Sequence, residues 1–555
     1  MEFKVTIIKE PKAEPFDVVL THPVTIETLV KRYGQDLPYR VIVAKQNNEV
    51  HELTQIISAP CTIQFMDIRQ QEANAVYQHS LIMLYLKAIH DLMGRVVVEV
   101  TNPINKGVFT IIHTFEPLTV AQVKRIEKRM WELVHEDIPF KKEIFTRNEA
   151  LNIMVDDGFS VKAKVLMADD KLNRYRFYSL NGIRNFFYSR MVPSTGYVDK
   201  FALKKYGKGV IIRIPHAYSP DKLPEYRDDK KLYKAFGEAA QWGRLMGVSY
   251  VWDLNEKIKS GEYKELILLS EALHEKKIAE IADKITRSGR RIILIAGPSS
   301  SGKTTFARRL CTQLKVNGLK PIYMGTDDYF VNRAETPLDA HGEPDFECLE
   351  AVDIELFNRN LNDLLAGKEV DLPTFDFVEG NKIFGDRVTK ISKTQPIVIE
   401  GIHALNEALT PYIEREKKFK IYISPLTQLN IDGHNRISTT DARMLRRLVR
   451  DNRFRGNSAQ KTIATWPKVR NGEEKYIFPY NGEADVLFNS VHIYELAVLK
   501  KYAQPLLEEI GPDEDEYSEA VRMLRFLRFF ATIEDDSVIV NNSIIREFIG
   551  GSIFV

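Results

Sequence analysis

The sequence is poor in cysteine and has no long apolar run. Its 555 residues include only three cysteines, and none of them forms a CxxC pair. This small, odd number excludes a disulfide framework and a cysteine-based zinc site. No stretch is long and apolar enough to span a bilayer, and residues 1–10 lack the apolar core of a signal peptide. We therefore expect a cytoplasmic protein without a membrane partner.

The sequence also lacks an excess of either charge and any low-complexity segment. Its 78 Lys and Arg residues nearly balance its 76 Asp and Glu residues. This balance gives no overall signal for a nucleic acid or a membrane surface. The chain is too long for a single hydrophobic core, so we expect about three or four domains.

The pattern of apolar residues divides the chain into five parts. Alternating residues near the N-terminus indicate short strands, a mixed pattern follows, and helical spacing dominates residues 229–287. We predict a β-rich domain at 1–66, an α+β domain at 70–215, a helical connector at 216–287, an α/β domain at 288–510 and a C-terminal extension at 511–555 packed on the α/β domain.

The fourth part alternates short β-branched runs with helical segments. This alternation is typical of a parallel sheet with helices on both faces, which is the fold class that we predict for it. The strands are expected at residues 291–296, 321–326, 396–399, 420–424 and 485–488.

A phosphate-binding loop follows the first of these strands. The segment GPSSSGKTT has the spacing of a P-loop, and the residues after it have the apolar spacing of a helix. Backbone N–H groups of such a loop surround phosphate oxygens, the lysine reaches the β- and γ-phosphates and the next hydroxyl ligates Mg²⁺. The predicted nucleotide-binding residues are Gly297, Pro298, Ser299, Ser300, Ser301, Gly302, Lys303, Thr304 and Thr305.

Acidic residues directly follow two of the other predicted strands. Asp327 and Asp328 follow residues 321–326, and Glu400 follows residues 396–399. Ligands bind at the carboxyl ends of parallel strands, so Asp327 is a candidate base for a substrate hydroxyl and Glu400 a candidate for Mg²⁺. The alternatives are a helix-capping or water-bridged role for the aspartates and a simple turn position for Glu400.

Arginines crowd residues 443–455. Four of them recur at helical spacing, which places several guanidinium groups on one side of a helix. A mobile lid of this kind excludes water and neutralises charge on a transferred phosphoryl group. The alternative is a solvated helix face paired with Asp441 and Asp451.

In this order, the motifs resemble the uridine kinase branch of the uridine kinase and phosphoribulokinase superfamily over residues 288–510. The matching strings are GPSSSGKTT, TDDYF, LPTFDFVEG, IEGIHAL and RRLVRDNRFRG. The resemblance implies ATP and Mg²⁺, with metal contacts at Thr304, Asp327 and Glu400. It implies catalytic roles for Asp327, Lys303, Arg446, Arg450 and Arg455.

The acceptor side departs from the family pattern. Where relatives hold the ribose diol with an aspartate, Glu347 is the nearest counterpart and Asp345 a second candidate. Phe375 and Phe377 are candidates for stacking on a base, although an aromatic pair is as often core. Gly380 stands near the position of a base-contacting histidine, so the resemblance implies a nucleoside more strongly than uridine. The predicted substrate-binding residues are Asp327, Glu347, Phe375, Phe377 and Arg443.

The N-terminal parts resemble domains of threonyl-tRNA synthetases. Residues 1–66 are similar to a TGS domain, and residues 70–215, with the string VPSTG, are similar to the second additional domain, which edits mischarged tRNA. That domain normally carries four zinc ligands. Here only His79 remains, because the other positions hold Met83, Phe187 and Met191, so we expect no zinc and no editing.

Three functions stay open at this stage. The first is an ATP-dependent kinase for a nucleoside 5′-hydroxyl, and the second is a kinase for another small acceptor such as a sugar phosphate. The third is an ATP-sensing RNA-binding regulator, for which the lysines at 200, 204, 205 and 208 would contact phosphates. An oligomer remains open as well.

Overall fold

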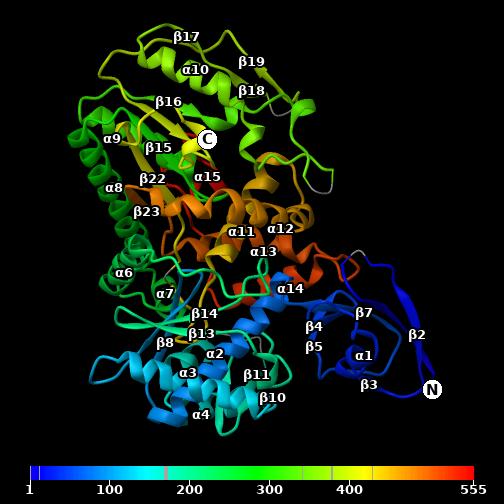
Figure 1. Ribbon diagram of the computed structural model, residues 1–555. Helices are drawn as coiled ribbons and strands as arrows, with labels where there is room; N and C mark the ends of the chain where they lie inside the picture. The colour runs from blue at the N-terminus through cyan, green and yellow to red at the C-terminus, as the bar shows by residue number, and fades with distance from the viewer. Residues whose placement is uncertain (1, 12, 168–172, 340–341, 377–378, 428) are drawn as a thin grey trace.

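The computed structural model describes residues 2–11, 13–167, 173–339, 342–376, 379–427 and 429–555 (Figure 1). The chain opens with a five-stranded sheet in the order β2-β1-β7-β4-β5, in which only β1 and β7 are parallel. The elements of this N-terminal part are β1 (Phe3–Ile8), β2 (Phe16–Leu20), β3 (Val24–Thr25), α1 (Ile26–Tyr33), β4 (Val41–Gln46), β5 (Glu49–Glu52), β6 (Ile56–Ile57) and β7 (Cys61–Asp67).

A middle region follows, with two antiparallel sheets packed around a buried helix. The helix is α2 (Gln71–Met93), and its apolar residues are buried because sheets and α3 (Val120–His135) surround it. The remaining elements are β8 (Val98–Ile104), β9 (Gly107–Ile112), β10 (Lys141–Thr146), α4 (Arg147–Asp156), α5 (Ser160–Met167), β11 (Arg174–Leu180), β12 (Ile183–Phe186), β13 (Ala202–Tyr206) and β14 (Gly209–Arg213).

The predicted helical connector consists of α6 (Lys230–Leu245), α7 (Val251–Lys259) and α8 (Tyr263–Ser288). The buried face of α8 carries Leu266 and Ile278 together with Glu271 and His274, whereas Leu269 is 49% exposed. Polar side chains fill this face since they meet polar partners from distant segments, which periodicity does not reveal.

The C-terminal half contains the parallel sheet that the sequence predicted. Its strand order is β16-β21-β15-β22-β23, and every neighbouring pair is parallel. Alternate residues of the central strand β15 face opposite cores: Ile293 packs with α8 and α9, and Leu294 packs with α10. The elements are β15 (Ile292–Ala296), α9 (Lys303–Val316), β16 (Ile322–Gly325), α10 (Ile354–Leu365), β21 (Ile397–Glu400), β22 (Lys418–Ser424) and β23 (Val486–Asn489).

Short strands and further helices complete the C-terminal half, and the last helix packs beside the parallel sheet. Figure 1 shows the short C-terminal helix α15 (red) beside the parallel sheet and α11. These elements are β17 (Val370–Asp371), β18 (Thr374–Asp376), β19 (Asn381–Ile383), β20 (Val388–Thr389), α11 (Thr439–Arg455), α12 (Ala459–Tyr476), α13 (Glu495–Glu508), α14 (Tyr517–Leu527) and α15 (Arg546–Ile549). The 3₁₀ turns are Thr195–Tyr197, Thr326–Tyr329, Arg333–Glu335, Leu349–Ala351, Glu407–Leu409, Arg415–Lys417 and Phe478–Glu483.

Backbone hydrogen bonds join the middle region and the helical connector to the C-terminal half. Val100 N donates to Gly433 O at 2.8 Å, and Val251 N donates to Asn430 O at 2.9 Å. Both acceptors lie in the segment between β22 and α11, so this segment holds the C-terminal half to the middle region and to the helical connector. Among the described residues, no helix is long and apolar enough to cross a membrane.

Candidate active site

The loop between β15 and α9 has backbone angles that depend on its glycines. Gly302 has φ +84°, and Ser300 also adopts a left-handed conformation with φ +58°. A Cβ placed on Gly297 would lie 2.1 Å from the carbonyl oxygen of Ile423, so only glycine fits beside β22. The loop therefore has the conformation and close packing that a phosphate cradle needs.

A buried carboxylate and a buried arginine hold the loop from behind. Glu473 of α12 accepts a hydrogen bond from Ser299 N at 2.9 Å, and Arg443 of α11 donates to Ser299 O at 2.9 Å. Arg443 and Glu473 also form an ion pair, which Arg470 joins at 2.7 Å. These contacts fix the loop backbone, and the sequence carries no motif that would have identified Glu473.

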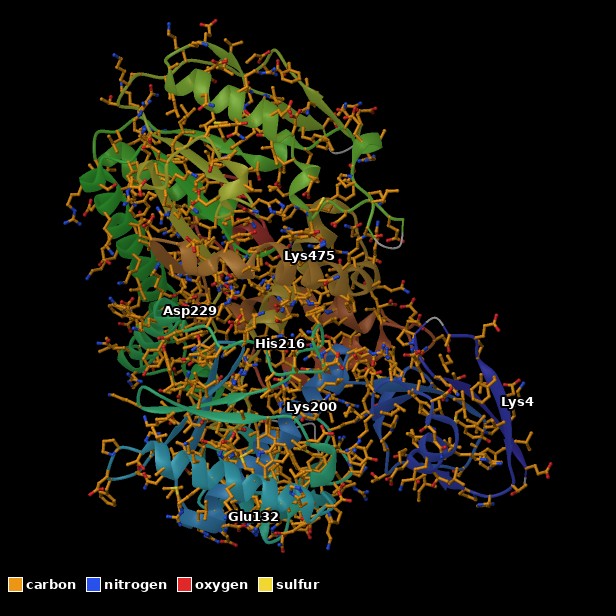
Figure 2. All side chains as sticks on the ribbon, viewed as in Figure 1. Lys4, Glu132, Lys200, His216, Asp229 and Lys475 are labelled. Atoms are coloured by element: carbon orange, nitrogen blue, oxygen red, sulfur yellow. The ribbon has the colours of Figure 1, made fainter. Side chains whose placement is uncertain are left out.

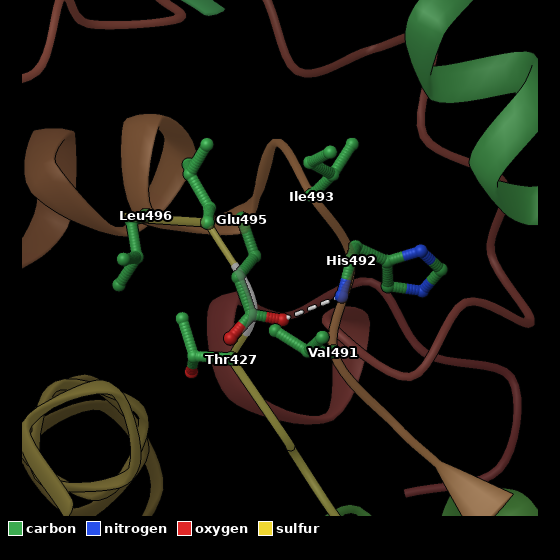
Figure 3. Close-up of a pocket in the computed structure, with 7 residues that line it drawn as sticks. Thr427, Val491, His492, Ile493, Glu495 and Leu496 are labelled. Carbon is green, nitrogen blue, oxygen red and sulfur yellow. Dashed lines mark hydrogen bonds between the residues drawn. The ribbon is translucent and has the colours of Figure 1, made fainter. Parts of the chain in front are cut away.

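A second buried pair supports the next residue of the loop. Arg446 donates to Ser300 O at 3.3 Å and is paired with Glu495 at 2.6 Å. Figure 3 shows Glu495 accepting from the backbone N–H of His492, beside a cavity of about 10 Å³, about the space that one water molecule needs. Arg443 and Arg446 are 1% and 0% exposed. Both guanidinium groups thus contact the loop from beneath, and the substrate-binding role of Arg443 and the catalytic role of Arg446 stay predictions.

Hydroxyl and carboxylate groups meet where α9 begins. Thr304 Oγ1 and Tyr323 OH each donate to Glu400 Oε1 at 3.0 Å. Burial raises the pKa of Glu400, and the nearby Lys303 opposes this shift. Lys303 Nζ lies 3.3 Å from Pro298 O, so its side chain curls over the loop. The predicted neighbours Lys303, Thr304 and Glu400 thus lie together at one sheet edge, and Tyr323 was missed.

Asp327 lies at the same edge, at the end of β16. Its side chain keeps access to solvent, yet the surrounding protein raises its pKa by desolvation while Lys303 lowers it. The adjacent Asp328 turns to another partner and forms an ion pair with Arg387 at 2.7 Å. Only Asp327 of the two therefore stays available to a bound molecule.

The donor set at this edge fits a magnesium ion. Mg²⁺ prefers hard oxygen ligands, and it commonly uses one or two carboxylates together with phosphate oxygens and waters. The hydroxyl of Thr304 is hydrogen-bonded to the Glu400 carboxylate, and electrostatic coupling joins Glu400 to Asp327. These three residues would hold the ion, either directly or through its waters.

Three further arginines surround a single carboxylate. Asp451 pairs with Arg447 at 3.2 Å, Arg450 at 2.8 Å and Arg455 at 3.7 Å. Arg450 and Arg455 also lower the pKa of Asp327, so their charge reaches the site. The predicted lid residues Arg450 and Arg455 thus lie near Asp327, with an excess of positive charge that suits a phosphorylated substrate.

The acceptor candidates lie against α12. Asp345 Oδ1 accepts from the backbone N–H of Glu347 at 3.0 Å, and Tyr476 OH lies 3.4 Å from Asp345 Oδ2. Gly472 lets Glu347 approach, since a Cβ on Gly472 would lie 2.7 Å from that of Glu347. Burial, followed by the charge of Glu473, raises the pKa of Glu347 to about 7. Glu347 lies beside the loop, and its carboxyl group therefore changes charge at a pH of about 7.

Aromatic rings continue from the acceptor candidates. Phe330 has edge-to-face contacts with Phe375, at 5.8 Å between ring centres, and with Phe346, at 6.4 Å. Phe375 is 7% exposed, so its ring belongs mostly to the core, whereas Phe346 is 43% exposed. Phe377 lies outside the described residues. The structure thus offers Phe346, which sequence reasoning passed over, as an accessible ring.

His79 and the other positions compared with zinc ligands in the Sequence analysis are enclosed in apolar core. His79 contacts the rings of Phe187 and Tyr188, and Met83 and Met191 are at most 2% exposed. Burial lowers the pKa of His79 to about 4, which keeps its ring neutral. Apolar packing therefore surrounds the positions that hold zinc ligands in the synthetase domain which this region resembles.

The lysines that were predicted to bind RNA make contacts within the protein. Lys200, labelled in Figure 2, donates to Pro220 O at 3.1 Å, and Lys204 Nζ lies 3.2 Å from the ring centre of Tyr226. Lys205 donates to Gly207 O. An RNA role for this cluster stays a prediction.

Comparison with known proteins finds relatives that match the part of the chain containing this site. The sequence pattern described as "PRK: Phosphoribulokinase / Uridine kinase family" matches residues 292–497. The uridine kinase of Staphylococcus aureus (strain JH9) is 30% identical over 198 residues, which cover 35% of this chain and 86% of the relative. The uridine kinase of Ligilactobacillus salivarius is 28% identical over 197 residues, covering 35% and 83%. A solved structure of a possible uridine kinase from Bacillus stearothermophilus covers 38% of this chain and 97% of its own, with 22% identity and a TM-score of 0.27.

Proposed function

Through residues 292–497 the chain belongs to the phosphoribulokinase and uridine kinase family, and we propose that it is an ATP-dependent nucleoside kinase acting on the ribose 5′-hydroxyl. One observation carries this proposal: a single edge of the parallel sheet brings together the P-loop, Lys303, Thr304, Glu400 and Asp327. Uridine kinases are among the relatives that match this part of the chain.

Each group at this edge has a role in the proposed transfer. The loop N–H groups and Lys303 hold the donor phosphates, and Mg²⁺ bound near Thr304 and Glu400 would neutralise their charge. The acceptor oxygen forms a bond to the γ-phosphorus, the bond from this phosphorus to the β,γ-bridging oxygen breaks, and Asp327 takes the hydroxyl proton. Arg450 and Arg455 stabilise charge on the transferred group.

The test is an acceptor panel with MgATP. Nucleosides are offered one by one, and ADP formation is measured together with the 5′-monophosphate product. We expect at least one nucleoside to be phosphorylated at the 5′ position. Turnover of no nucleoside would refute the acceptor assignment, and the other acceptors described next would then take its place.

A sugar phosphate is the second candidate acceptor. Three arginines, Arg447, Arg450 and Arg455, share the single carboxylate of Asp451, which leaves positive charge for a phosphate already present on the acceptor. Including pentose phosphates in the panel separates the two cases, because they give a bisphosphate product.

Lys303→Ala is expected to lower kcat/KM by about 10²–10³-fold, the usual loss when one preorganised charge on a transition state is removed. Lys303 Nζ donates to Pro298 O at 3.3 Å, so its ammonium group lies over the loop that would bind the donor phosphates. Steady-state kinetics in MgATP measure the effect. Lys315→Ala is the matched control, since Lys315 is exposed in the last turn of the same helix; equal losses in both variants would contradict the role of Lys303.

Acceptor binding is expected to depend on pH through Glu347. Its pKa of about 7 means that the carboxyl is protonated below this pH and charged above it. The charged form presents two acceptor oxygens to the sugar hydroxyls, whereas protonation turns one of them into a donor, so the acceptor KM should fall as pH rises through about 7. Glu347→Gln should raise this KM and flatten its pH profile, and an unchanged profile in the variant would exclude Glu347 as the cause.

A further inference from the structure

The C-terminal segment, residues 543–549, lies directly against the P-loop. A Cβ placed on Gly302 would lie 2.4 Å from Ile544 Cγ2, so this isoleucine touches the loop. Ser543 donates to the buried carboxylate of Glu271 in α8. Phe548 packs in the same core as the P-loop helix, which agrees with the place of α15 in Figure 1. The segment is therefore part of the wall of the donor site.

The side chain of Glu547 from this segment occupies an anion position of the loop. Glu547 Oε2 accepts from Thr305 Oγ1 at 2.7 Å and from Thr305 N at 3.2 Å. Thr305 is the third residue of α9, and N–H groups in the first turn of a helix have no partner within the helix. In a P-loop such groups bind donor phosphates. A carboxylate thus stands where a phosphate oxygen would accept the same two hydrogen bonds.

We propose that Glu547 competes with the donor nucleotide for Thr305 and so sets the affinity for ATP. The proposal rests on the proposed function, because it assumes that the loop binds MgATP. The Glu547 carboxylate and a phosphate of the nucleotide cannot both accept the same two hydrogen bonds from Thr305. Two negative groups so close together also repel each other. The donor therefore binds after the carboxylate of Glu547 has turned away.

The displacement involves the side chain and not the whole segment. Ile544, Ile545, Phe548 and Ile549 are at most 2% exposed. Releasing four such side chains into water would oppose binding by more than about 10⁴-fold. Among the described residues, Thr305 is the hydrogen-bond partner of the Glu547 carboxylate, so rotation of this side chain breaks two hydrogen bonds. The segment thus stays in place while one carboxylate moves.

The test is the affinity of the full chain for MgATP without an acceptor, measured by isothermal titration calorimetry. Glu547→Gln removes the charge and keeps the size, so we expect it to bind MgATP at least about tenfold more tightly than the wild type, about 1.4 kcal/mol. Glu547→Asp keeps the charge but is one methylene too short to hold Thr305, and it should also bind more tightly. In turnover, the KM for ATP should fall in both variants while the acceptor KM stays constant.

Glu534→Gln is the matched control, because Glu534 is an exposed glutamate shortly before the segment; its affinity should equal that of the wild type. Equal or weaker binding of MgATP by both Glu547 variants overturns the inference and leaves the proposed function intact. If neither the wild type nor any variant binds MgATP, the proposed function fails and the inference fails with it.

Discussion

Asp327→Asn is expected to lower kcat by about 10²–10⁴-fold, the range that a general base contributes. The carboxylate lies at the end of β16, keeps access to solvent and faces the positive charges of Lys303, Arg450 and Arg455. Asparagine has nearly the same shape but accepts no proton, so the loss should fall on the transfer step. Steady-state kinetics give kcat, and calorimetry gives the affinity for MgATP, which should change by less than about threefold.

Asp328→Asn is the control for this result. It makes the same chemical change one residue later, where the carboxylate is engaged by Arg387 at 2.7 Å. We expect a much smaller loss of kcat in this variant. Similar rates in Asp327→Asn and the wild type would remove Asp327 from the base role, and a loss confined to ATP affinity would assign it to the metal alone.

Glu473→Gln is expected to reduce the free energy of unfolding by about 3–5 kcal/mol, the usual cost when one partner of a buried ion pair is removed. Glu473 is 0% exposed and pairs with both Arg443 and Arg470. The substitution leaves two buried guanidinium groups without a full counter-charge. It also weakens the contact with Ser299 N, so activity should fall along with stability. Urea denaturation followed by tryptophan fluorescence measures the change, since Trp466 lies in the same helix.

The effect of Glu473 on stability should depend on pH. Burial alone would raise its pKa, but Arg443 and Arg470 outweigh burial and hold the pKa below the ordinary 4.5. The charged group therefore stabilises the fold above about pH 4.5, and this stabilisation is lost as pH falls through the lower folded value. The difference between wild type and variant should shrink at acidic pH.

Glu474→Gln is the control, because Glu474 neighbours Glu473 and pairs with Arg470 at the more exposed side. Its loss should be about 1 kcal/mol or less, as for pairs near the surface. Equal destabilisation by both substitutions would contradict a special role for the buried carboxylate.

The sequence did not show which arginines of residues 443–455 are buried and which lie near Asp327. Helical spacing correctly put residues 443–455 in one helix, α11. It did not separate Arg443 and Arg446, which are buried under the loop, from Arg450 and Arg455, which lie near Asp327. Their partners Glu473 and Glu495 come from α12 and α13, so the division arises only when these helices pack together.

The sequence by itself determined the parallel sheet, the loop after β15 and the acids at the ends of β16 and β21, because strand periodicity, glycine geometry and strand-end position are local properties of the chain. Only the tertiary structure decided which charged side chains are buried and what faces them. Glu547 follows Thr305 by 242 residues, yet its carboxylate meets the first turn of α9. Such contacts depend on how distant segments pack and on the desolvation that follows, and no spacing within one segment encodes them.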